Sequence, residues 1–65
     1  MKVLLTTAHC NPPLTRTYEC AEARYFENKH KVSMYDKKGK LIAWAITDEW
    51  QAVVFEKDGK TYVIK

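Results

Sequence analysis

Four residues of this chain have the side-chain chemistry of a metal site or a covalent reaction: His9, Cys10, Cys20 and His30. Cysteine and histidine are the usual ligands of structural zinc, and zinc-binding cysteines are typically paired about two to four residues apart. Here His9 and Cys10 are adjacent, while Cys20 and His30 follow at intervals of ten residues. This spacing does not favour zinc, and we expect neither a metal nor another cofactor.

A cysteine with His9 or His30 as its base is the one enzymatic arrangement that these residue types allow. Such chemistry also requires an orienting group and an oxyanion site. The sequence contains no glycine-rich phosphate loop and no Gly-x-Ser-x-Gly motif. We therefore expect a protein that is not an enzyme, in which Cys20 is a small core residue and Cys10 a loop thiol.

Positive charge is concentrated between Lys29 and Lys40, although the formal net charge of the chain is only +3. A basic cluster of this kind suits nucleic acid or an acidic protein surface, while a solvated lysine-rich hairpin is the alternative. Trp44 is either a core residue or, on an uncovered face, a contact residue. The predicted binding residues are Arg24, Lys29, Lys31, Lys37, Lys38, Lys40 and Trp44.

The length and composition indicate one globular domain, residues 1–65. A chain of 65 residues, of which 46% are hydrophobic, can form a compact core, although folding at this size buries only about 60% of the unfolded surface. The start Met1–Leu5 is charged at Lys2, and Thr6 and Thr7 end its apolar run well short of the roughly 7–15 apolar residues of a signal peptide. No stretch approaches the ~20 apolar residues of a membrane span. We expect a cytoplasmic protein. In the reducing cytoplasm a Cys10–Cys20 disulfide would not persist.

The stretch Lys40–Thr47 contains the longest apolar run and predicts a central strand. Along a strand, side chains alternate between the two faces. Ile42, Trp44 and Ile46 would then form a bulky face, and Leu41, Ala43 and Ala45 a small face that a helix could approach closely.

The residues before the central strand predict a strand, a loop and a helix. Lys2–Thr7 is a short apolar run typical of a strand, and Asn11-Pro12-Pro13 marks a loop over Ala8–Leu14. Thr15 or Thr17 can cap a helix that ends near Asn28, because apolar residues recur there at the spacing of one helical face. The alternative is a strand over Glu22–Glu27.

The remaining residues alternate with period two and predict four strands, Val32–Met34, Leu41–Ile46, Trp50–Phe55 and Tyr62–Ile64. Asp36-Lys37-Lys38-Gly39 and Asp58-Gly59 have the residue types of hairpin turns. The predicted fold class is α+β: an N-terminal strand, one helix and a four-stranded antiparallel meander. A small all-β half-barrel is the alternative.

The predicted central strands carry apolar residues on both faces, while a single helix covers only one face of a sheet. The second face is then buried by curling of the sheet or left for another chain. An uncovered face would make the protein a homodimer or a binding module.

The predicted chain begins with a Met-Lys strand and a loop, after which Leu14-Thr15 opens a short helix. A meander follows and ends with Trp50–Phe55 and Glu56-Lys57-Asp58-Gly59-Lys60-Thr61-Tyr62-Val63. This order of elements resembles that of small phage-encoded inhibitors. In particular it is similar to type I-F anti-CRISPR proteins. The resemblance implies a protein that docks on a CRISPR surveillance complex. The chain departs from that pattern in its loop Ala8–Leu14 and in having Arg24 alone where a basic pair would stand.

Two functional hypotheses follow. The first is a small interaction protein, a phage or mobile-element inhibitor that binds a host protein or ribonucleoprotein complex. The second is a nucleic-acid-binding β module, in which the basic residues above contact phosphates while Trp44, Tyr35 or Tyr25 stacks on bases.

Overall fold

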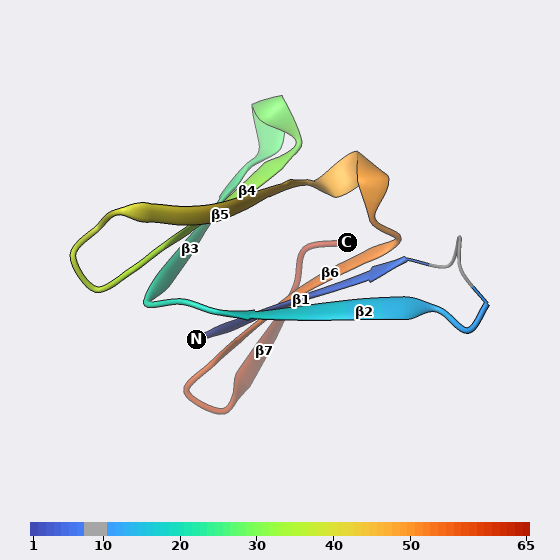
Figure 1. Ribbon diagram of the computed structural model, residues 1–65, viewed down its shortest axis with the longest axis horizontal. Coiled ribbons are helices and arrows are strands. Elements are labelled where there is room, and N and C mark those ends of the chain that lie inside the picture. Colours follow the sequence, from blue (N-terminus) through green and yellow to red (C-terminus); the bar gives the residue numbers. More distant parts are fainter. Residues whose placement is uncertain (8–10) are drawn as a thin grey trace.

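The computed structural model describes residues 1–7 and 11–65 and consists of seven strands in two antiparallel sheets (Figure 1). The first sheet has the strand order β2-β1-β6-β7 and the second β3-β4-β5. The strands are β1 (Lys2–Thr7), β2 (Leu14–Glu19), β3 (Glu22–Phe26), β4 (Lys31–Tyr35), β5 (Leu41–Ile46), β6 (Ala52–Lys57) and β7 (Lys60–Val63). Two 3₁₀ turns, η1 (Glu27–Lys29) and η2 (Thr47–Glu49), are the helical segments among the described residues. No helix in this part of the chain is long and apolar enough to cross a membrane.

The predicted helix is wrong, and with it the α+β fold class. The segment after the prolines forms β2 and β3, and the all-β alternative and the strand over Glu22–Glu27 agree with the structure far better. Thr15 and Thr17 are β-branched, and Tyr18, Tyr25 and Phe26 are aromatic; these residue types suit a pleated strand as well as the apolar spacing suits a helix. Pairing decides between them, because β2 and β3 each find a long antiparallel partner, in β1 and β4 respectively.

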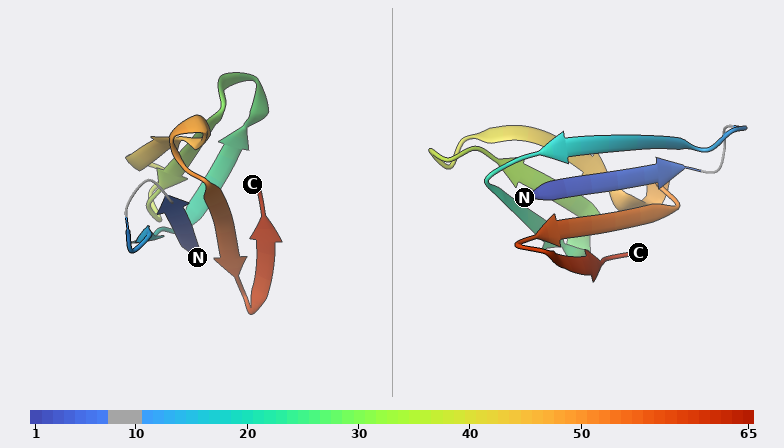
Figure 2. Two further views of the ribbon diagram at one scale, coloured as in Figure 1. Left: turned by 90° about the vertical axis from the view of Figure 1, so that its right-hand side faces the viewer. Right: turned by 90° about the horizontal axis from the view of Figure 1, so that it is seen from below.

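One sharp corner joins the two sheets. Only Cys20 and Ala21 separate β2 from β3, and the backbone amides of these two residues bind opposite sheets. Cys20 N–H donates to the Met1 carbonyl at 3.0 Å, and Ala21 N–H donates to the Tyr35 carbonyl at 2.9 Å. A nearly continuous strand therefore begins in the first sheet and ends in the second, and Figure 2 shows the first sheet lying across the second.

The four predicted later strands are confirmed, but their order as one meander is wrong. β4 pairs with β5 and β6 pairs with β7, each as an antiparallel hairpin, whereas β6 pairs with β1 and not with β5. The turn η2 carries the chain between sheets: Thr47 N–H donates to the His30 carbonyl, and Gln51 N–H donates to the Thr6 carbonyl, both at 2.8 Å. Both hairpin turns use a glycine with positive φ, Gly39 at 81° and Gly59 at 76°.

The core lies between the two sheets and takes alternate residues from the central strands β1, β6 and β4 and one residue from the edge strand β5. Its buried apolar side chains are those of Val3, Leu5, Val53 and Phe55 in the first sheet and Val32, Met34 and Ala45 in the second. The alanine face of β5 is thus covered, but by the first sheet and not by a helix. The prediction of a central strand over Lys40–Thr47 is wrong, because among the described strands β5 pairs only with β4 and lies at the edge of its sheet. The opposite face of β5 is left to solvent.

Met34→Ala should lower the free energy of unfolding by about 2–5 kcal/mol, because it opens a cavity where the side chain is fully buried. Val63→Ala is the control: Val63 is 71% exposed, so its truncation should cost less than about 0.5 kcal/mol. Urea denaturation followed by tryptophan fluorescence measures both. Equal costs for the two variants would contradict the assigned core.

Candidate docking surface

The outer side of the sheet β3-β4-β5 presents three rows of side chains, which we call the Trp44 face. The register places Arg24, Ser33 and Trp44 in the middle row. One flanking row is Phe26, Lys31 and Ile46, and the other is Glu22, Tyr35 and Leu41. The other side of each strand, at Ala23, Met34 and Ala43, belongs to the core.

The predicted alternation along β5 holds from Ala43 to Ile46 and fails before it. The register between β4 and β5 shifts at Met34 and Tyr35, so that Leu41, not Ile42, lies opposite Tyr35. Such a bulge places one extra residue in a strand and redirects its side chains. Leu41 therefore joins the Trp44 face, and Ile42 lines a shallow hollow with Met1 and Cys20.

Trp44 is the dominant side chain of this face. It is 58% exposed although it lies in the middle row of a sheet. Its cross-strand neighbour Ser33 is only 2% exposed, because the larger side chains around it cover its small side chain. The result is a row in which an aromatic ring and a guanidinium lie on either side of a serine.

Cations lie over two of the aromatic rings of the face. The Lys31 Nζ atom is 5.3 Å from the centroid of the Trp44 ring, and Arg24 Cζ is 5.3 Å from that of Tyr35. Arg24 also pairs with Glu22, with Nε 3.2 Å from Oε1, and this hydrogen bond raises the pKa of Arg24 above its ordinary value. These contacts hold the two cations against the sheet.

The other predicted binding residues lie at the two ends of the same sheet. Lys29 is in η1, at one end of β4, whereas Lys37, Lys38 and Lys40 are in the turn that follows its other end. The five residues of β4 separate the two groups by about 15 Å. The stretch Lys29–Lys40 is therefore two basic sites and not one, with Arg24, Lys31 and Trp44 between them.

The turn between β4 and β5 directs positive charge into solvent. Asp36, its one acid, accepts hydrogen bonds at Oδ1 from the backbone amides of Lys38 and Lys40, both at 2.9 Å. Its carboxylate is thus committed to shaping the turn. All three lysines of the turn are exposed.

The residues suggested for metal or covalent chemistry do not form a site among the described residues. His9 and Cys10 lie outside them, while Cys20 and His30 lie near opposite ends of β4. Burial raises the pKa of the Cys20 thiol, which disfavours the reactive thiolate. The His30 Nδ1 atom is 3.5 Å from Asp48 Oδ1, at the end where η1 meets η2. No three histidine, cysteine or acidic residues in the described part are grouped so as to hold a metal ion.

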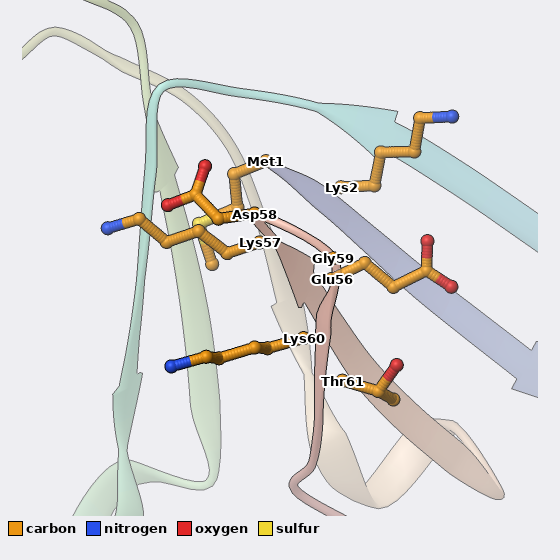
Figure 3. Close-up of a pocket in the computed structure, with 8 residues that line it drawn as sticks. All are labelled: Met1, Lys2, Glu56, Lys57, Asp58, Gly59, Lys60 and Thr61. Atoms are coloured by element: carbon orange, nitrogen blue, oxygen red, sulfur yellow. The ribbon is translucent and has the colours of Figure 1, made fainter.

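A second hollow lies beside the turn between β6 and β7 (Figure 3) and is lined by Met1, Lys2 and residues from Glu56 to Thr61. Figure 3 shows the Lys57 and Lys60 ammonium groups extending to one side, with the Lys2 ammonium and the Glu56 carboxylate on the other. Its polar groups diverge, so it lacks the converging groups of a small-molecule site.

The Trp44 face gathers three of the predicted binding residues and adds several that were not predicted as such. Ser33, Leu41, Ile46 and the Arg24 partner Glu22 belong to it, and Tyr25, opposite Val32, points to the other side of the sheet. A strand period over residues 22–26 would have placed Glu22 beside Arg24. Comparison of the chain with known protein families, curated proteins and solved structures finds no match.

In a Cys10→Ser variant, alkylation of Cys20 should be slower in the folded chain than in urea. Burial raises the folded pKa, so less thiolate is present at a given pH and the rate should rise only at higher pH. Iodoacetamide labelling followed by mass spectrometry over a pH series measures this. A folded midpoint at or below the unfolded one would mean an activated thiol.

Proposed function

We propose that the chain is a small non-catalytic interaction protein that docks on a protein surface of a host complex through the Trp44 face. The observation that carries the proposal is the exposure of Trp44, 58%, on the outer side of a sheet whose other face is the core. Exposure of a large indole to water is unfavourable unless a partner covers it. Tryptophan, tyrosine and arginine are also the residue types enriched at binding hot spots.

The surroundings of Trp44 favour a protein partner over stacked bases. Leu41 and Phe26, at 46% and 39% exposed, extend the apolar area to both sides. Lys31 lies over the Trp44 ring, so a base would have to displace it before stacking. Aromatic residues and arginine are enriched at protein interfaces, and this face has both.

The nature of the host complex is part of the same proposal. The hairpin Lys57-Asp58-Gly59-Lys60 and the Tyr62 that follows are the part of the resemblance to type I-F anti-CRISPR proteins that persists in the fold, as β6 and β7. The helix expected to open at Leu14-Thr15 is a strand instead. We retain an inhibitor of a CRISPR surveillance complex in the host cytoplasm as the specific form of the proposal.

Trp44→Ala should remove binding to the host complex, because the indole is the central anchor of the face; truncation of a hot-spot residue weakens affinity by about 2 kcal/mol or more. Tagged wild-type and variant chains are added to nuclease-treated host lysate, and the recovered proteins are quantified.

Val63→Ala is the matched control, since it truncates an exposed apolar residue on the outer side of the other sheet. It should recover the same partner in the same amount as the wild-type chain. Equal recovery by Trp44→Ala, with both variants folded by thermal unfolding, would show that the Trp44 face is not the docking surface.

Direct nucleic-acid binding is the second candidate, and the turn between β4 and β5 favours it. Lys37, Lys38 and Lys40 are exposed, and the carboxylate of Asp36 is engaged by backbone amides. Three exposed ammonium groups at one end of an aromatic face suit a single-stranded nucleic acid that crosses the sheet.

If the chain binds nucleic acid, changing Lys37, Lys38 and Lys40 together to Glu should abolish affinity for a single-stranded oligonucleotide. Wild-type affinity should also fall steeply as salt rises, because released counterions oppose binding. Fluorescence anisotropy over a salt series measures both effects. Negligible wild-type binding at about 50 mM salt would eliminate this candidate.

A further inference from the structure

β5 is an edge strand without the usual protection of an edge. The sheet edges are β2 and β7 in the first sheet and β3 and β5 in the second. β2, β3 and β7 each contain charged residues, whereas β5, Leu41–Ile46, contains none. Native edges without charge, proline or cover tend to pair with another strand.

The backbone of β5 offers free hydrogen-bonding groups at its centre. Ala21 N–H binds the Tyr35 carbonyl and Thr47 N–H binds the His30 carbonyl, which fixes the side to which each β4 residue directs its backbone groups. By the alternation of an antiparallel pair, Ala43 and Ala45 bond to β4, while Trp44 and Ile46 direct their N–H and C=O groups away from it. No described strand pairs with β5 on that side.

The sequence around Trp44 is the same in both directions. Ile42-Ala43-Trp44-Ala45-Ile46 is a palindrome centred on the tryptophan. Two antiparallel copies related by a two-fold axis at Trp44 place Trp44 opposite Trp44 and Ala43 opposite Ala45, while the bulge directs Ile42 away from the Trp44 face. The tryptophans then meet each other and the alanines meet each other, as self-complementary interfaces require.

We propose that β5 pairs with β5 of a second copy of this chain, forming a two-fold symmetric dimer with a continuous sheet of six strands. The same symmetry sets the basic turn of one copy, with Lys40, beside η2 of the other, with Asp48 and Glu49. The axis brings the turn that carries Lys40 in one copy and the turn that carries Asp48 in the other to the same end of the pairing. Charges of opposite sign therefore flank the apolar pairing at both of its ends.

The dimer places the two Trp44 side chains next to each other on the outer side of the joined sheet. This doubles the Trp44 face whatever macromolecule docks there, so the inference goes beyond the proposed function. Dimerisation is measured on the purified chain without a partner, which keeps its test separate from the capture experiment.

Sedimentation equilibrium over a concentration series should give twice the mass of the 7.6 kDa chain at high concentration. Ile46→Pro removes an N–H directed at the open edge and none that bonds to β4, and the Ile46 backbone, with φ −90° and ψ 120°, is close to what proline adopts. This variant should raise the dimer dissociation constant at least about tenfold. Ile46→Val, which keeps the N–H, should leave it unchanged.

A charge exchange tests the two-fold register independently of the proline. Asp48→Lys and Lys40→Glu should each weaken the dimer, since each sets like charges opposite one another, and the double variant should restore it. Within one chain these two residues lie at opposite ends of the six-residue β5, about 20 Å or more apart. Restoration by the double variant therefore reports contact between copies.

Three outcomes would overturn the inference. A wild-type chain that stays monomeric at every concentration excludes the dimer. A dimer that Ile46→Pro leaves intact while the variant remains folded uses another surface. A double variant as weak as the single variants excludes the register centred on Trp44.

Discussion

The structure depends on one constraint: a chain of 65 residues folded into two sheets can form a core only from the side chains on the facing sides of those sheets. The corner at Cys20 and Ala21 meets this constraint by letting a nearly continuous strand serve both sheets. It sets β1 and β4 across from each other, so that Leu5 and Met34 are buried in the same cluster. With a single layer of apolar contacts, each core side chain carries a large share of the stability.

The side chains that are exposed on the second sheet are those on the side of each strand that the core does not bury. Ala43 and Ala45 let the second sheet lie close to the first, and the bulky side of β5 is left outward as a consequence. Lys31 and Arg24, in the same sheet, cover the rings of Trp44 and Tyr35 and reduce their apolar exposure. The surface that results combines exposed aromatic and aliphatic side chains with cations above two of its rings and lysines at its ends, which suits recognition by contact.

The same strand, β5, contributes both to the Trp44 face and to the open edge of the sheet. β5 presents Trp44 outward from the sheet and its backbone groups sideways from it, so a partner on the face and a second copy at the edge do not compete for the same atoms. The turns at its two ends have opposite charge, Lys37 to Lys40 before it and Asp48 with Glu49 after it. A strand with such ends complements itself only when antiparallel.

The sequence by itself determined the strands of the later half and both glycine turns, because period-two alternation and the residue types of hairpin turns are local signals. It could not decide residues 14–26, where helical spacing and strand alternation coexist and only pairing with β1 and β4 distinguishes them. Nor could it place Arg24 and Trp44 in one row, because each pairs with Ser33 on the strand between them and not with the other. Long-range pairing supplies the backbone hydrogen bonds that separate these alternatives, and it exists only in the tertiary structure.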